Sequence, residues 1–172
     1  SDYLQGQNLS RWLAENRPTT AQTIRIVAAL ADALSHAHAH RTVHRDLKPA
    51  NVILTEGLNP VIVDFGLAVS DPLTTGSHKG LVSGTPSYMS PEQAKGEGHR
   101  IDGRTDVYAL GVILYLMLTG QRPFQGKVMS ELVRQITEDE PQPPRQLMHD
   151  IPPELERICL KAMAKKFTAR YT

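Results

Sequence analysis

The sequence has 172 residues, which suffices for one domain of ordinary size. Its 19 Lys and Arg residues nearly balance 18 Asp and Glu residues, and the resulting net charge of +1 argues against a nucleic-acid-binding or membrane-surface protein. The single cysteine, Cys159, excludes an internal disulfide, and the longest apolar run (107–118) is shorter than the ~20 residues of a membrane helix. We therefore expect a globular, cytoplasmic chain without a membrane segment of its own.

Two helices are predicted in residues 8–40. Asn8 can cap a short helix that ends at Glu15, ahead of Pro18, and Thr19 or Thr20 can cap a long helix that runs to about His40. Apolar residues in the long helix recur at helical spacing and predict one buried stripe. The residues of this predicted stripe are Ile24, Val27, Ala28, Ala31 and Leu34.

A β-hairpin and a long loop are predicted next. Residues 52–54 and 61–63 are β-rich runs, and residues 57–60 between them, Gly-Leu-Asn-Pro, indicate a turn. A hairpin would bring its two ends close together. Residues 70–104 are rich in Ser, Thr, Gly and Pro without clear periodicity, which predicts a long loop, and loops of that length in compact domains are usually functional or disordered.

The remainder of the chain is predicted to be helical. Residues 106–119 are apolar nearly all round and are followed by Gly120, as expected of a buried central helix. Residues 129–138 and 154–165 are amphipathic, and a proline-rich connector (141–153) separates them. The fold class predicted is therefore mainly α with a small β-hairpin. Inward positions of the last two helices are expected to be Leu132, Val133, Ile136, Leu155, Ile158 and Met163.

Polar residues flank both ends of the predicted hairpin. Asp46, Lys48 and Asn51 precede it and Asp64 follows it, so strands ~5 Å apart could bring all four side chains to one site. Carboxylate and amide oxygens suit Mg²⁺, and a lysine suits a phosphate. Asp46 would then be left to accept a proton from an incoming hydroxyl. The pattern predicts phosphoryl transfer from a metal-bound nucleotide.

These residues resemble motifs of the protein kinase family. The run 44–51, HRDLKPAN, is similar to the family's catalytic loop, and 64–66, DFG, to its metal-binding motif. The run 84–92, GTPSYMSPE, resembles the end of an activation segment, with Ser90 where alanine is usual, and 106–111 resembles the opening of the family's buried F helix. The run 90–97, SPEQAKGE, most resembles sequences of bacterial relatives of eukaryotic Ser/Thr kinases.

The resemblance implies catalytic roles for the residues around the hairpin. Asp46 would be the catalytic base, and Asn51 and Asp64 would hold Mg²⁺. Lys48 would contact the transferred phosphate, and it marks the Ser/Thr branch of the family. The implied cofactors are ATP and Mg²⁺, and the implied partners are protein substrates.

The resemblance also implies roles in the activation segment. Thr85 would lie beside the accepting hydroxyl and bond to Asp46. Arg45 would bind a phosphate placed on the loop and so order it, although an arginine there could equally pair with a carboxylate. Candidates for the phosphorylated residue are Thr74, Thr75, Ser77 and Ser83.

Other residues of the motifs are implied to have structural roles. His44 and Phe65, with Gly66 beside them, would be packing elements, and Asp106 would brace the backbone of the catalytic loop. Finally, Glu92 would pair with Arg170.

The chain's first residues resemble the family's hinge. Asp2 and Leu4 would bond adenine through their backbone, and Ile53 would form the floor of the adenine pocket. The resemblance covers the whole chain but only the hinge and the C-terminal lobe of a kinase domain, with the final helix missing and without a Gly-rich loop, a strand lysine or a helix-C glutamate. We therefore expect a fragment, inactive alone, of a kinase that could be membrane-anchored elsewhere.

Two other functions stay open from the sequence. One is a non-catalytic, lobe-only module that binds partners through its substrate-facing surface and the predicted helix 129–138. The other is a small-molecule phosphotransferase of related fold. Lys48 and the run 84–92 favour a peptide substrate instead.

Overall fold

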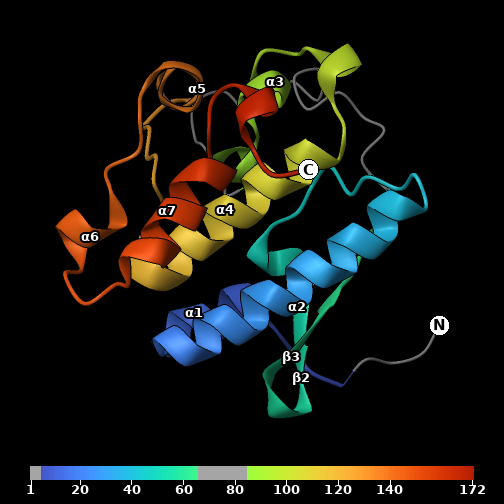
Figure 1. Cartoon of the computed structure of the whole chain (residues 1–172), viewed down its shortest axis with the longest axis vertical. Coiled ribbons are helices and arrows are strands. Elements are labelled where there is room, and N and C mark those ends of the chain that lie inside the picture. The colour runs from blue at the N-terminus through green and yellow to red at the C-terminus, as the bar shows by residue number, and fades with distance from the viewer. Residues whose placement is uncertain (1–4, 66–84) are drawn as a thin grey trace.

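The computed structural model describes residues 5–65 and 85–172 (Figure 1). Predictions for several residues fall outside these ranges, namely those for Asp2, Leu4, Gly66, Thr74, Thr75, Ser77 and Ser83. The helices are α1 (Leu9–Glu15), α2 (Thr20–Ala39), α3 (Pro91–Ala94), α4 (Gly103–Thr119), α5 (Met129–Glu138), α6 (Pro144–Leu147) and α7 (Pro153–Ala162), and the strands are β1 (Gln7–Asn8), β2 (Val52–Thr55) and β3 (Asn59–Ile62).

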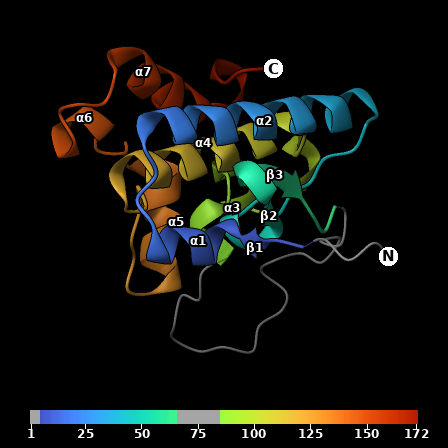
Figure 2. The same ribbon diagram turned by 90° about the horizontal axis from the view of Figure 1, so that it is seen from below.

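Helix α4 forms the centre of the molecule, as its apolar sequence predicts. It packs against α2 on one side and α7 on the other, and Tyr108 and Ile113 are fully buried. Figure 2 shows α6 and α7 toward one side of the molecule and the strands with α1 toward the other, with α2 and α4 between them. Helix α4 begins three residues before the predicted start because Asp102 caps it, and Gly120 ends it in the left-handed conformation with φ of 77°.

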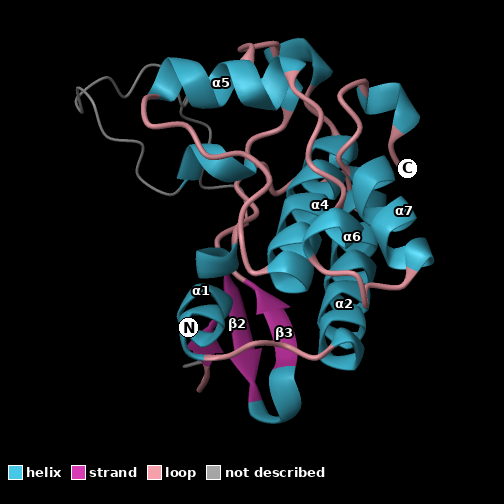
Figure 3. Cartoon of the chain, turned by 90° about the vertical axis from the view of Figure 1, so that its left-hand side faces the viewer, coloured by secondary structure: helices cyan, strands magenta, loops and turns pink. Residues whose placement is uncertain are grey.

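The predicted β-hairpin forms and is joined by a third strand. Strands β2 and β3 pair antiparallel, with Val52 opposite Ile62, and β1 pairs with the other edge of β2. Figure 3 shows this sheet with α1 beside it at one edge and α2 at the other. The ends of the hairpin meet as predicted, since the Val63 N–H donates to the Asn51 carbonyl at 3.0 Å. A two-residue strand is too short to leave a period in the sequence, so the sequence does not predict β1.

The predicted inward stripe of α2 is confirmed in part, and the predicted ends of the helix are confirmed. Leu34 is buried and Val27 packs against the core, whereas Ile24, Ala28 and Ala31 are exposed. Thr19 caps the helix in a capping box with Gln22. However, Ile24 is 47% exposed, whereas Ile26 is fully buried. Apolar residues extend round much of this helix, so two stripes one residue apart both fit the period of 3.6 residues. The stripe that faces the core contains Thr23, Ile26, Leu30 and Leu34.

The prediction of an unbroken loop over 70–104 is wrong for residues 85–104. This part holds a 3₁₀ turn (Thr85–Tyr88), helix α3, a second 3₁₀ turn (Gly98–Arg100) and the start of α4. Helix α6 likewise interrupts the predicted connector. Helices of one turn are too short to show a periodic pattern, so the sequence does not predict them. Within the two described ranges, none of the helices is both long and apolar enough to cross a membrane.

Candidate functional site

A buried carboxylate on α4 holds the loop that precedes the hairpin. The two oxygens of Asp106 accept the backbone N–H groups of His44 and Arg45, each at 2.8 Å. The ring Nε2 of His38, on α2, lies 2.8 Å from Oδ2 of the same carboxylate. Because the Asp106 side chain is only 1% exposed, these donors replace the water that its charge would otherwise bind. The loop is thereby fixed to the two central helices.

Asp46 lies on this loop among donors from its own segment. Lys48 Nζ lies 2.6 Å from Asp46 Oδ2, and the Asn51 side-chain amide donates to the Asp46 carbonyl at 2.9 Å and to Oδ2 at 3.3 Å. The Asp46 side chain is 31% exposed, so it is held in place and can still be reached by a ligand. A carboxylate held by a cation and an amide is oriented for chemistry at one position.

Asn51 brings the loop next to the segment that follows the hairpin. With its amide nitrogen directed at Asp46, its amide oxygen points elsewhere and can serve as a ligand. The backbone bond from Val63 to Asn51 places Asp64 one residue beyond this contact. Asp64 is exposed, and within the described parts of the chain no hydrogen bond to its carboxylate is found. Asn51 and Asp64 are therefore brought to neighbouring positions.

The His44 side chain links the loop before the hairpin to the segment after it. Its Nε2 lies 2.9 Å from the Val63 carbonyl and therefore donates to it, and its Nδ1 accepts the Asp46 N–H at 3.2 Å. Its ring, fully buried, meets the ring of Phe65 edge to face at 4.9 Å. His44 and Phe65 therefore pack against each other.

The backbone is left-handed at two positions of the site. Arg45 has φ of 69° and Asp64 has φ of 62°, a region that non-glycine residues seldom enter. Such strain persists only where the surroundings hold it, and it gathers at functional sites. Here the strained residues are Arg45, which directly precedes Asp46, and Asp64.

A second buried network fastens α3 to the end of the chain. Two nitrogens of Arg170 donate to the two oxygens of Glu92 at 2.7 and 2.8 Å, and Thr105 Oγ1 donates to the same carboxylate at 2.9 Å. Burial raises the pKa of Glu92, but the hydrogen bonds it accepts and the charge of Arg170 together hold that pKa below its ordinary value. The expected pair of Glu92 and Arg170 is therefore present, whereas the sequence gives no sign of the part of Thr105.

The structure gives fewer contacts for the other predicted site residues that it describes. Thr85 begins the 3₁₀ turn Thr85–Tyr88. Arg45 has an exposed side chain, and among the ion pairs of residues 5–65 and 85–172 none involves it. Ile53 on β2 pairs with Asn8, and a Cβ on Gly6 would lie only 2.7 Å from Ile53 Cγ2. The backbone just after the expected hinge therefore passes directly over the expected pocket floor.

Sequence reasoning misses three contributors to these networks: His38, Gln93 and Thr105. Gln93 donates to the Arg45 carbonyl at 2.7 Å. Each of the three lies in a helix, where local pattern gives no sign of a partner far along the chain.

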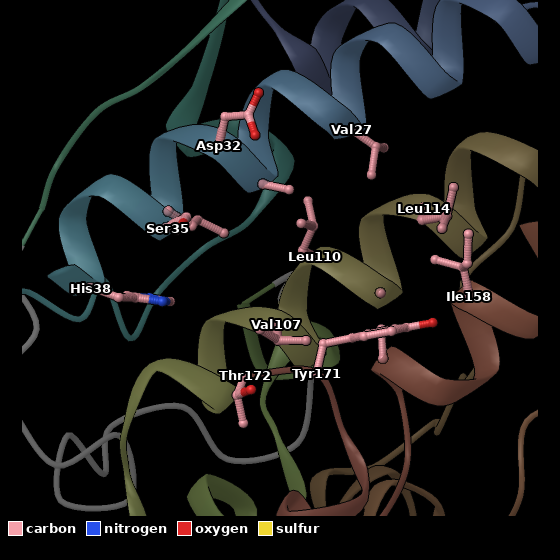
Figure 4. A pocket seen from close by; sticks show the side chains of 14 residues that line it. Val27, Asp32, Ser35, His38, Val107, Leu110, Leu114, Ile158, Tyr171 and Thr172 are labelled. Atoms are coloured by element: carbon pink, nitrogen blue, oxygen red, sulfur yellow. The ribbon is translucent and has the colours of Figure 1, made fainter.

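A separate cavity of about 410 Å³ lies between α2, α4 and α7 (Figure 4). Val27, Leu114, Ile158 and Tyr171 give it a mainly apolar wall, and His38 reaches it at one end. The described residues that line it include none of the four predicted catalytic and metal-binding residues. It is therefore distinct from the candidate site.

Comparison with known proteins places the chain in a family. Its residues 1–172 match the family described as "Protein kinase domain". It is 37% identical over 173 residues to "Serine/threonine-protein kinase PknB" of Mycolicibacterium smegmatis, covering 99% of this chain and 27% of that protein. It is 39% identical over 175 residues to "Serine/threonine-protein kinase Pkn1" of Myxococcus xanthus, covering 99% of this chain and 25% of that protein. It is 33% identical over 171 residues to "Serine/threonine-protein kinase PrkC" of Bacillus subtilis, covering 99% of this chain and 26% of that protein.

The chain spans about a quarter of the length of these relatives. All three are bacterial and are named serine/threonine kinases, which confirms the resemblance drawn from the motifs. The chain belongs to the protein kinase family.

Proposed function

We propose that this chain is part of a protein serine/threonine kinase, which transfers the γ-phosphate of ATP to protein hydroxyl groups. The observation that carries the proposal is the grouping of Lys48 and Asn51 around the Asp46 carboxylate, with Asp64 just beyond. A pair of charges at 2.6 Å that remains partly exposed suits a site where a proton and a phosphate are exchanged.

The chemistry follows from these positions. Asp46 would accept the proton of the substrate hydroxyl as its oxygen bonds to the γ-phosphorus and the bond from that phosphorus to the β–γ bridging oxygen breaks, releasing ADP. Lys48, bonded to Asp46 Oδ2, would hold the carboxylate and meet the developing charge on the phosphoryl oxygens. Thr85 is proposed to lie beside the accepting hydroxyl.

Asn51 and Asp64 fit a magnesium ion. Mg²⁺ prefers oxygen ligands and is usually bound by one or two protein groups together with phosphates. The amide oxygen of Asn51 is turned away from Asp46, because the amide nitrogen is committed there, and the Asp64 carboxylate is exposed. Mg²⁺ bound there would neutralise part of the phosphate charge.

We also propose that the chain corresponds to the hinge and the C-terminal lobe of the kinase domain. The 172 residues contain the catalytic loop and the run 84–92 but no Gly-rich loop and no strand lysine for the phosphates. Positioning supplies most of the catalysis in phosphoryl transfer, so this chain alone should turn over poorly. Adenine would then rest on Ile53, with Asp2 and Leu4 bonding it through their backbone.

Arg45 is proposed to bind a regulatory phosphate. Its exposed guanidinium would pair with a phosphate on Thr74, Thr75, Ser77 or Ser83. Since ATP is supplied inside cells, the proposed reaction places this chain on the cytoplasmic side. The alternative, a lobe that only binds partners, is favoured by no particular observation.

The test uses the full-length protein that contains this chain, with Mg²⁺ and radiolabelled ATP and a generic protein substrate. We expect label on serine or threonine that disappears with EDTA and returns with Mg²⁺. Asp64→Asn, which weakens the charge facing the metal, should lower kcat about 100-fold or more. The matched control is Asp150→Asn, an exposed carboxylate near α7, which should change nothing. Labelling that survives EDTA, or Asp64→Asn at wild-type rate, would contradict the proposal.

A further inference from the structure

The backbone N–H and the backbone carbonyl of Arg45, a strained residue, are both hydrogen-bonded by side chains from outside the loop. Its N–H donates to Asp106 of α4 at 2.8 Å, and its carbonyl accepts the side-chain amide of Gln93 of α3 at 2.7 Å. Arg45 directly precedes Asp46 and has φ of 69°. A left-handed residue relaxes when its hydrogen bonds are lost, and here relaxation would turn the residue that carries the carboxylate.

Both amide atoms of the Gln93 side chain, Oε1 and Nε2, are hydrogen-bonded. It is only 8% exposed, and its Oε1 accepts the backbone N–H of Ser90 at 3.1 Å, while its own backbone N–H donates to Ser90 Oγ at 3.4 Å. With its oxygen used in this capping box, its nitrogen points at the Arg45 carbonyl. The amide cannot turn over without losing the contacts of both its oxygen and its nitrogen.

The chemical identity of residue 93 separates two roles. A capping box works equally well with glutamate or glutamine, because it needs only an acceptor oxygen. The Arg45 carbonyl needs a donor, which glutamine has and an ionised glutamate lacks. Capping alone therefore does not require the residue that is present, whereas the contact with the catalytic loop does.

We propose that Gln93 is a positioning residue for Asp46, acting through the Arg45 peptide. It and Asp106 form a clamp that holds Arg45 in its left-handed conformation and so keeps Asp46 directed at the substrate hydroxyl. The inference rests on the proposed kinase function for its catalytic part. The clamp itself is a property of the fold and can be measured without activity.

The first arm of the test compares three variants of the full-length protein. Gln93→Glu keeps the capping acceptor and removes the donor, and Gln93→Met removes both without adding a charge. Ser90→Ala weakens the cap but keeps the donor. Assays are run below the melting temperature of every variant. A small misplacement of a catalytic group can cost about 100-fold, so we expect both Gln93 variants to lower kcat about 10- to 100-fold with KM for ATP nearly unchanged. Ser90→Ala should lower kcat less than either Gln93 variant does, because the backbone N–H of residue 90 still holds Gln93 Oε1.

The second arm measures hydrogen exchange of the Arg45 amide, which the clamp protects. Exchange should be faster in Gln93→Met than in Ser90→Ala. Wild-type kcat in both Gln93 variants would overturn the proposal, and so would unchanged exchange at Arg45. If the wild-type protein transfers no phosphate, the proposed function fails, and a faster exchange in Gln93→Met would still support the clamp.

Discussion

Replacing Asp46 by asparagine in the full-length protein should lower kcat about 10²- to 10⁴-fold, the range typical for loss of a general base. The carboxamide has nearly the shape of the carboxylate but cannot take the proton of the substrate hydroxyl. The side-chain oxygen that remains after the substitution can still accept from Lys48, whose Nζ lies 2.6 Å from Asp46 Oδ2, so the loop should keep its place. Steady-state phosphate transfer with a saturating protein substrate measures the loss.

Two controls separate chemistry from folding in this experiment. The Asp46→Asn variant should bind Mg²⁺ and ATP with wild-type affinity and melt at nearly the same temperature. Asp32→Asn, which alters an exposed carboxylate on α2, should leave kcat unchanged. If Asp46→Asn retained wild-type turnover, Asp46 would not be the proton acceptor.

Removing the charge of Glu92 should cost about 3–5 kcal/mol of unfolding free energy, the usual result of leaving a buried charge without its partner. The Arg170 side chain is fully buried and that of Glu92 is 3% exposed, so water cannot replace the lost interaction. The change is Glu92→Gln, and urea unfolding measures it. The pair of Arg157 with Glu154 serves as a control, because both side chains are exposed and Glu154→Gln should change the unfolding free energy far less than Glu92→Gln does. Equal costs at the two sites would contradict the structural role of Glu92.

The same residue should make stability sensitive to acid. Burial raises the pKa of Glu92, but its hydrogen bonds and the charge of Arg170 together keep that pKa below its ordinary value of 4.5. The folded state therefore binds a proton at this group less readily than the unfolded state does. The contribution is fully present above pH 4.5 and is lost as pH falls through the lower pKa of the folded state. Unfolding free energies measured from pH 7 downward should therefore fall less steeply below pH 4.5 in Glu92→Gln than in the wild type. Identical slopes would refute this assignment.

Local signals in the sequence predict most of the larger elements. Caps at Asn8 and Thr19 give the starts of α1 and α2, and amphipathic spacing gives both ends of α5. The one-turn helices α3 and α6 escape prediction, because a single turn is too short to show a period. The predicted face of α2 is partly wrong because its apolar residues fit two stripes, and only packing in the folded chain selects Ile26 rather than Ile24 for burial.

The candidate site divides in the same way. The motifs around Asp46 and Asp64 can be read from sequence because their residue types and spacing carry the chemistry. Among the residues that hold them, Asp106 is implied by the resemblance, but His38 and Gln93 are not, since His38 is 68 positions from Asp106 and Gln93 is 48 positions from Arg45. Such contacts depend on how helices cross, which no local pattern specifies.

The account depends on Asp46, Asn51 and Asp64 facing one bound metal–nucleotide. The most direct measurement is a crystal structure of the full-length protein with Mn²⁺ and a non-hydrolysable ATP analogue, in which anomalous scattering locates the metal. We predict Mn²⁺ bound by the Asn51 amide oxygen and the Asp64 carboxylate, with the γ-phosphate facing Asp46. A metal held without these two side chains, or phosphates bound away from Asp46, would contradict the account.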